Sequence, residues 1–266
     1  MRFASGQFAA GTDKAANLSA ALRLMDEAAA GGAEFLLMPE TSLYATAEPS
    51  TVLAAIAEPL DGPFITALAK RAAELSLSIM IGIIEKNGDG LPFNAAIAID
   101  HTGAVVGSYH KVHLYDALGY VESDGIQPGE LTRPFILEYG DLHVGVFTCY
   151  DLRFPESARR VMDEGANVLL LPAMWAAGPG KVDTWTTLVR ARAIENTTYI
   201  VSANQTGPLA TAHSMIVDPT GAIIADAGDE PGVIFADIDA TRVDEVRVGV
   251  PSLANRRFSV VDRLGR

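Results

Sequence analysis

Short apolar runs alternate with helix-like segments along most of this chain, and that alternation restricts the possible folds more than any other feature of its sequence. The first units, in the order strand, helix, strand, helix, strand, are predicted at Phe3 to Ala9, Lys14 to Ala30, Phe35 to Met38, Phe64 to Leu75 and Ile79 to Ile84. Two further runs, Asn94 to Asp100 and Ala104 to Tyr109, flank a Gly-containing turn and predict a hairpin. This mixture favours a large mixed sheet, or two sheets, covered by helices over a purely parallel doubly wound fold.

The second half of the chain continues in the same style. Strands are predicted at Phe135 to Tyr139, Leu142 to Thr148, Asn167 to Leu171 and Tyr199 to Ala203, and helices at Pro155 to Glu164, Asp183 to Asn196 and Asp239 to Val246. Pro172 to Gly180 is too rich in Gly and Pro to predict regular structure. An antiparallel series is predicted at His213 to Val217, Ala222 to Ala225 and Val233 to Ile238. Neither a linker nor an internal repeat is visible, so we expect residues 1–266 to form one domain.

The composition excludes several classes of partner. The net charge of −13 repels phosphate backbones and anionic lipid surfaces, so we expect neither nucleic acid nor a membrane as a partner. No apolar run reaches the roughly 18 residues that span a bilayer, and no signal-peptide-like segment is present. The single cysteine can form neither an internal disulfide nor a thiolate metal site, which suits a reducing compartment and predicts a cytoplasmic protein.

That cysteine, Cys149, lies where a predicted buried strand ends and a loop leads into a helix. In α/β enzymes such a junction can present a nucleophile to a cleft, with the backbone N–H of the next residue, Tyr150, directed at a developing oxyanion. The alternative is a buried structural cysteine, because free cysteine is among the most buried residue types. Position alone does not separate the two readings.

Two other reactive side chains also follow predicted strands, Glu40 and Lys111. Together with Cys149 they could perform acyl transfer: the thiolate attacks, the carboxylate moves protons and the ammonium stabilises the oxyanion. Ordinary pKa values of about 4.3 and 8.5 oppose proton transfer from thiol to carboxylate by about 5.7 kcal/mol. A shared pocket could close that gap, since a neighbouring lysine lowers the pKa of a thiol and burial raises that of a carboxyl group.

Glu122, in the long loop from Tyr115 to Arg133, is a candidate second carboxylate, with a solvated loop acid as the alternative. A Cys-His pair finds less support. His143 lies six residues before Cys149, roughly 20 Å away along a strand. His113 could enter the cleft or could be a loop residue bonded to backbone. The chain carries no zinc or nucleotide-binding signature, so we expect neither a metal nor a cofactor.

Three segments in order now resemble the signatures of the nitrilase superfamily of carbon-nitrogen hydrolases. They are Pro39-Glu40, the stretch YHKVHL from Tyr109 to Leu114, and the stretch CYDLRFPE from Cys149 to Glu156. Further matches extend the resemblance over nearly the whole chain, at Arg190 to Asn196, Ala203 to Gln205, His213 to Pro219 and Asp237 to Asp239. CYDLRFPE is most similar to the amidase branches that include ω-amidase and deaminated glutathione amidase. Where those amidases read Gly-Pro-Ala-His-Trp, this chain has the longer stretch Gly178 to Trp185, which puts their substrates in doubt.

The resemblance implies an α-β-β-α sandwich, with two mixed sheets flanked by helices, that forms a homodimer or a higher homo-oligomer. It implies Glu40 as general base, Lys111 as oxyanion stabiliser and Cys149 as nucleophile, and it makes Glu122 the fourth site residue. We therefore expect a hydrolase that cleaves a linear carboxamide through a thioester and releases ammonia and a carboxylic acid. The alternatives are an N-carbamoyl amino acid hydrolase of the same superfamily and a non-catalytic binding protein on this fold.

Three residues besides Tyr150 are candidates for contact with a small-molecule amide. Arg153, four positions after the candidate nucleophile, could bind a substrate carboxylate bidentately, or could instead pair with Asp151 or Glu156. Met174 and Trp175 could line the mouth of the pocket, with ordinary core packing as the alternative.

Overall fold

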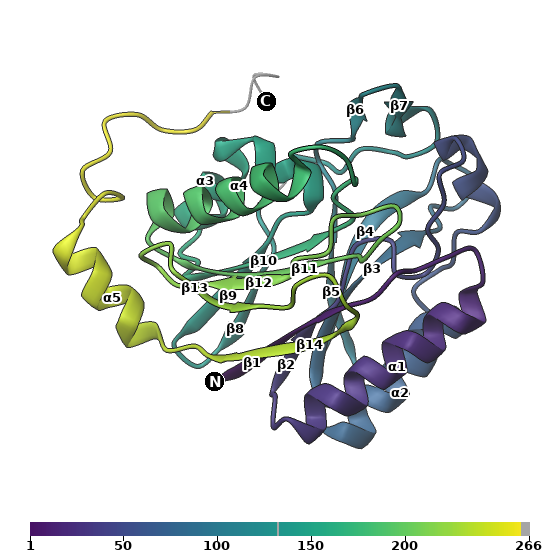
Figure 1. Cartoon of the computed structure of the whole chain (residues 1–266), viewed down its shortest axis with the longest axis horizontal. Coiled ribbons are helices and arrows are strands. Elements are labelled where there is room, and N and C mark those ends of the chain that lie inside the picture. The colour runs from purple at the N-terminus through teal and green to yellow at the C-terminus, as the bar shows by residue number, and fades with distance from the viewer. Residues whose placement is uncertain (132, 262–266) are drawn as a thin grey trace.

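Two six-stranded sheets lie face to face within residues 1–131 and 133–261, the part of the chain that this computed structural model describes (Figure 1). The first sheet has the order β14-β1-β2-β3-β4-β5. Its strands are β1 (Arg2–Gln7), β2 (Phe35–Leu37), β3 (Ser78–Glu85), β4 (Phe93–Ile99), β5 (Val105–His110) and β14 (Gly232–Asp237). The helices α1 (Lys14–Ala30) and α2 (Pro63–Leu75) cover its outer face, and Asp13 caps α1 by accepting two backbone hydrogen bonds, as residue types at this position predict.

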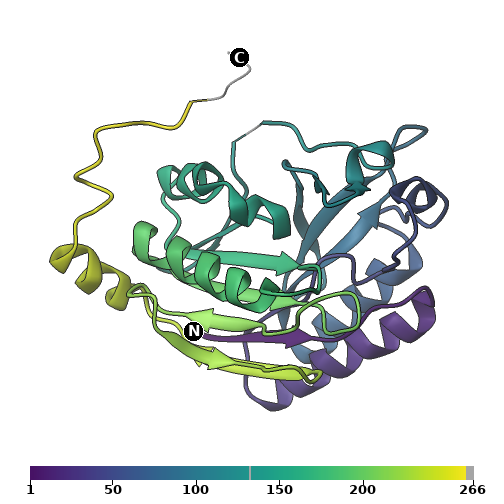
Figure 2. The same cartoon turned by 45° about the horizontal axis from the view of Figure 1, so that its top comes forward.

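The second sheet has the order β13-β12-β11-β10-β9-β8. Its strands are β8 (Ile136–Tyr139), β9 (Leu142–Val146), β10 (Val168–Ala173), β11 (Tyr199–Asn204), β12 (Met215–Val217) and β13 (Ile223–Asp226). The helices α3 (Pro155–Asp163) and α4 (Lys181–Asn196) cover its outer face, on the opposite side of the molecule from α1 and α2 (Figure 2). The predicted α-β-β-α sandwich with two mixed sheets is confirmed.

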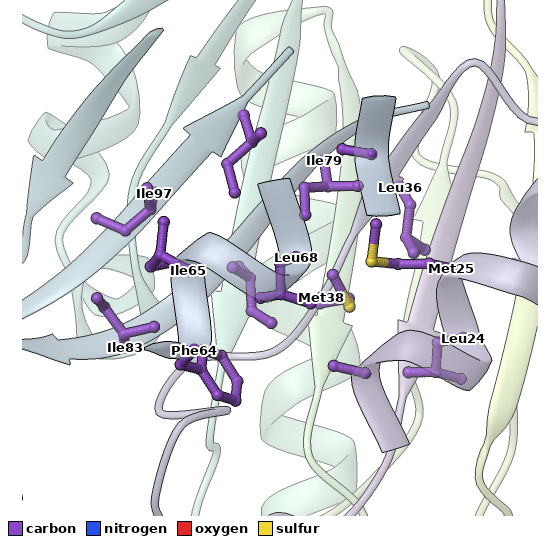
Figure 3. Packing of buried hydrophobic residues seen from close by; sticks show 14 of the residues in the cluster. Leu24, Met25, Leu36, Met38, Phe64, Ile65, Leu68, Ile79, Ile83 and Ile97 are labelled. Atoms are coloured by element: carbon purple, nitrogen blue, oxygen red, sulfur yellow. The ribbon is translucent and has the colours of Figure 1, made fainter. Parts of the chain in front are cut away.

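The alternation of side chains along each strand builds these layers. In β2, Phe35 and Leu37 point into the core between the two sheets, whereas Leu36 and the following Met38 join the core beneath α1 and α2. Figure 3 shows this outer core, where Leu24 and Met25 of α1 meet the sheet. Strands that are buried on both faces require continuous apolar runs, and the predicted strands have them.

The two sheets share one connectivity that the sequence did not reveal. The series β1-α1-β2-α2-β3-β4-β5 and the series β9-α3-β10-α4-β11-β12-β13 each contain three adjacent parallel strands followed by two antiparallel ones. Parallel neighbours need a crossover helix, whereas antiparallel neighbours need only a turn. The carboxyl ends of the parallel strands in both sheets therefore supply loops to the candidate site.

Three details of the prediction were wrong. The expected antiparallel series near the C-terminus is split, because β14 leaves the second sheet and pairs with β1. β10 continues through Pro172 to Ala173, inside the stretch expected to be irregular. The expected loop from Tyr115 to Arg133 contains β6 (Asp116–Ala117), β7 (Tyr120–Val121) and a 3-10 turn, η2 (Glu122–Asp124).

The remaining elements are two more 3-10 turns, η1 (Ser50–Ala55) and η3 (Cys149–Arg153), and the helix α5 (Ala240–Gly249), which leads into the C-terminal tail (Figure 1). Of the helices in the described part of the chain, none has the length and apolarity needed to cross a bilayer.

Candidate active site

Glu40 reaches the candidate site because the loop after β2 packs directly onto β3. The backbone N–H of Gly82 donates to Pro39 O at 2.9 Å, and that of Ser42 donates to Gly82 O at 2.8 Å. A Cβ atom at position 82 would lie only 2.4 Å from the Cα atom of Glu40, so this approach requires glycine. The loop thereby directs the Glu40 carboxylate inward, and its side chain is 3% exposed.

Lys111 follows β5 and lies between two carboxylates. Its Nζ donates to Glu40 Oε1 at 2.9 Å and to Glu122 Oε2 at 2.8 Å, with 2% of the side chain exposed. Asn94 of β4 bridges the same two acids, since its Nδ2 donates to Glu40 Oε1 and to Glu122 Oε1 at 2.8 Å each. Burial lowers the pKa of Lys111, but Glu122 and Glu40 outweigh it and hold that pKa well above the usual range. The ammonium stays charged at neutral pH.

Each acid is also held by a backbone donor. The N–H of Met174 donates to Glu40 Oε2 at 2.7 Å, and the N–H of Tyr115 donates to Glu122 Oε2 at 2.6 Å. Glu122 is therefore a buried member of this cluster, and the alternative of a solvated loop acid was wrong.

Cys149 is the first residue of η3 and directly follows Thr148, three positions after β9 ends at Val146. Its φ of +45° is left-handed, which is uncommon for a residue with a side chain and fits a sharp turn from strand to helix. Burial, the charge of Glu40 and a hydrogen bond with Glu40 raise the pKa of the thiol well above its usual range, although Lys111 lowers it. The resting thiol is therefore neutral, unlike the thiolate that a neighbouring lysine alone would favour.

All eight predicted site residues line one cavity of about 280 Å³. They are Glu40, Lys111, Glu122, Cys149, Tyr150, Arg153, Met174 and Trp175. Sequence reasoning did not single out other residues of this cavity wall, among them Asn94 and Lys181. Asn94 looked like an ordinary residue of a strand, although an asparagine among apolar strand residues is a signal of a buried polar contact, and Lys181 stood out only as part of the longer loop.

The rim of this cavity carries positive charge. The guanidinium of Arg153 lies 4.9 Å from the ring centroid of Trp175, and the ammonium of Lys181 lies 6.0 Å from the same ring. Within the described residues, no carboxylate pairs with either cation, so the alternative pairing of Arg153 with Asp151 or Glu156 is absent. The indole N–H of Trp175 is buried and has no acceptor in that part of the chain.

The histidines lie elsewhere. His113 does not line the cavity, among the residues described; its ring bonds to Asp151 and stacks on Phe154. A larger groove of about 1210 Å³ contains His110, His113 and His143 and none of the eight predicted site residues. No group of three or more His, Cys, Asp or Glu side chains in residues 1–131 and 133–261 could hold a metal ion.

Comparisons with known proteins give matches over nearly the whole chain. The family model described as carbon-nitrogen hydrolase matches residues 2–248. The deaminated glutathione amidase of Escherichia coli O157:H7 is 36% identical over 259 residues, which cover 97% of this chain and 98% of that protein.

Solved structures show the same fold. The NitFhit protein of C. elegans superposes with a TM-score of 0.87 at 29% identity; the match covers 96% of this chain and 65% of that one. A mutant amidase from Nesterenkonia sp. AN1 superposes with a TM-score of 0.83 at 27% identity, over 97% of this chain and 94% of that one. In that glutamate-to-glutamine mutant, the acetamide moiety of fluoroacetamide is covalently added at the active-site cysteine.

Proposed function

Because the chain belongs to the carbon-nitrogen hydrolase family, we propose that this amidase hydrolyses a linear carboxamide through a thioester on Cys149. The observation that carries the proposal is the contact of Lys111 with both Glu40 and Glu122 on the wall of the cavity that Cys149 also lines. The modified cysteine of the related amidase supports a covalent route. Products are ammonia and a carboxylic acid.

The first half-reaction begins from a neutral thiol. As the sulfur of Cys149 attacks the carbonyl carbon, its proton passes to the Glu40 carboxylate and a C–S bond forms. The protonated Glu40 then gives that proton to the amide nitrogen, the C–N bond breaks and ammonia leaves. The raised thiol pKa requires such a base, since little thiolate exists at neutral pH.

The second half-reaction uses the same carboxylate. Glu40 removes a proton from water, the hydroxide equivalent attacks the thioester carbonyl, and collapse of the tetrahedral intermediate breaks the C–S bond. Proton return from Glu40 restores the thiol. Glu40 is thus a base in the attack steps and an acid in the departure steps.

Lys111 and the backbone N–H of Tyr150 stabilise the oxyanion in both half-reactions. A charged donor in a buried site is strong because little water screens it. Glu122 positions that donor, since its Oε2 accepts a hydrogen bond from Lys111 Nζ at 2.8 Å. Loss of one oxyanion donor costs on the order of 10²- to 10³-fold in rate.

The rim indicates the substrate class. Besides Glu40, Lys111 and Glu122, the described residues with charge in the cavity wall are Arg153 and Lys181, both cations in a chain of net charge −13. Within the described residues, neither cation has a carboxylate partner, although the side chains of both lie within about 6 Å of the Trp175 ring. Two cations without a carboxylate partner fit a substrate carboxylate, so we propose amides that also carry a carboxylate. The name of the relative in Escherichia coli, a deaminated glutathione amidase, is consistent with such a substrate.

An N-carbamoyl amino acid also carries a carboxylate, and it remains the second candidate for this rim. The two are separated by their products: a carboxamide releases ammonia and a carboxylic acid, whereas an N-carbamoyl amino acid releases ammonia, carbon dioxide and an amino acid.

Ammonia release from matched pairs of amides tests the proposal. Succinamate and butyramide have the same carbon chain and differ in the terminal carboxylate, and N-carbamoyl-alanine completes the panel. We expect hydrolysis of succinamate at a kcat/KM at least about tenfold above that of butyramide, and no activity in Cys149→Ala. Equal rates on the pair would refute the substrate class, and an active Cys149→Ala variant would refute the mechanism.

Two coarser proposals rest on the resemblance and composition. Residues 1–266 form one domain that assembles as a homodimer, which light scattering during size-exclusion chromatography measures. The single cysteine supports a cytoplasmic location.

A further inference from the structure

Asp151 is a fully buried carboxylate that the proposed mechanism does not use, and it accepts four hydrogen bonds. Its Oδ1 accepts from the backbone N–H of His113 at 3.0 Å and lies 2.7 Å from His113 Nδ1. Its Oδ2 accepts from the Tyr109 hydroxyl at 2.7 Å and from the Thr148 N–H at 2.9 Å. A buried acid with this many donors is held in one position.

The sequence positions of these partners are informative. Tyr109 and His113 lie two residues before and two residues after Lys111, at the end of β5 in the first sheet. Asp151 lies two residues after Cys149, and Thr148 lies immediately before Cys149. Both lie just beyond the end of β9 in the second sheet. The carboxylate of Asp151 therefore joins the segment that carries the ammonium to the turn that carries the thiol.

We propose that Asp151 is a positioning residue that fixes Lys111 relative to the Cys149 thiol through its bonds to Tyr109 and His113. The inference rests on the proposed function, because Lys111 and Cys149, whose relative position Asp151 would fix, are the groups that carry out the proposed reaction. The left-handed backbone of Cys149 needs such support, since a conformation of this kind persists only where its surroundings fix it. Errors of about 1 Å in placing reacting groups can cost on the order of 10²-fold in rate.

The chain contains a matched control for this link. His110 and His113 both flank Lys111, and both side chains are 29% exposed. His110 Nε2 lies 2.8 Å from Glu85 and its ring stacks on Phe93 at 3.9 Å; the His113 ring stacks on Phe154 at 3.8 Å. The two histidines differ in the position of their carboxylate partners. Glu85, the partner of His110, belongs to β3 of the same sheet, whereas Asp151, the partner of His113, belongs to the turn after β9 that carries Cys149.

The experiment compares His113→Phe with His110→Phe in the full chain. Phenylalanine keeps the stacking and removes one bond to a carboxylate in each case. We expect kcat for succinamate to fall about tenfold in His113→Phe with KM within about twofold, because Asp151 does not line the cavity. His110→Phe should keep kcat within about twofold. Thermal unfolding should shift similarly in both variants, which controls for a general loss of stability.

A second readout does not depend on turnover. Lys111 lowers the pKa of the Cys149 thiol, so displacing its ammonium should move the pH midpoint of Cys149 alkylation by iodoacetamide upward. We expect this upward move in His113→Phe and in Tyr109→Phe, and none in His110→Phe. Equal kcat and equal midpoints in the two histidine variants would overturn the role of Asp151. If the wild type hydrolyses no amide, the proposed function fails while the alkylation midpoints still decide this inference.

Discussion

At the floor of the cavity, Lys111 lies between the buried acids Glu40 and Glu122, whereas at its rim Arg153 and Lys181 lie over Trp175 without a carboxylate among the described residues. The floor is a cluster in which one ammonium is paired with two carboxylates and nearly every polar atom has a partner. The rim has donors to spare. This difference corresponds to two tasks. The groups that perform the chemistry are held in place before the substrate binds, whereas the groups that select the substrate have no charged partner until it binds.

Removal of the central cation should break the floor most severely. Lys111→Met leaves two buried acids facing each other, so we expect a loss of about 3–5 kcal/mol in the free energy of unfolding and about 10²- to 10³-fold in kcat. Urea unfolding and ammonia release measure the two effects. Lys70→Met, at a lysine whose side chain is 80% exposed, is the control and should change neither beyond error. A stable, active Lys111→Met enzyme would mean that the floor is not organised around this ammonium.

Gly82→Ala should displace Glu40 without touching a charged group. The added Cβ would lie 2.4 Å from the Glu40 Cα, so the loop after β2 must move and kcat should fall about 10²-fold. Gly249→Ala, which meets no atom within 4 Å, provides the control. An unchanged kcat in Gly82→Ala would show that the position of Glu40 tolerates movement.

Glu40→Gln should sharpen the electrostatic side of the comparison. Glu40 raises the pKa of the Cys149 thiol, so removing its charge lowers that pKa and increases the thiolate fraction at a given pH. We expect the midpoint of iodoacetamide alkylation to move to lower pH and the rate at pH 8 to rise about tenfold, while amide hydrolysis is lost. A midpoint that stays in place or moves upward would contradict the placement of this carboxylate beside the thiol.

Substitutions at the rim should change selectivity more than chemistry. Arg153→Ala should lower kcat/KM for succinamate about tenfold and leave butyramide within about twofold, with most of the loss in KM. Lys181→Ala should also lower kcat/KM for succinamate selectively, but only about threefold, because the Lys181 ammonium lies farther from the Trp175 ring than the Arg153 guanidinium does. Equal losses on both amides would reassign these residues to the scaffold.

The sequence predicted the elements of the fold better than their assembly. Local patterns place a strand at Val233 to Ile238, but nothing local says that β14 pairs with β1, more than 200 residues earlier in the chain. The same limit hid the shared connectivity of the two sheets, which lies in the order of elements and not in residue identities.

The residues of the candidate site show the same limit: some could be predicted from local sequence patterns, and others depend on distant contacts. Glu40, Lys111 and Cys149 could be chosen because reactive residues at strand ends tend to converge, and the structure brings them to one cavity. Asn94 and Asp151 were missed as site residues because their importance lies in hydrogen bonds to residues 28 or more positions away. The burial of Glu122 likewise follows from its contact with Lys111, which lies outside the loop that carries Glu122.

The most direct test of the central claim is the mass of the Cys149 peptide from wild-type enzyme that is quenched in acid during turnover of succinamate. Covalent catalysis predicts a peptide heavier by the acyl group of the substrate, removable by hydroxylamine, with no adduct in Cys149→Ala. The account would be contradicted if the wild type released ammonia steadily while its Cys149 peptide stayed unmodified, and if Cys149→Ala also released ammonia.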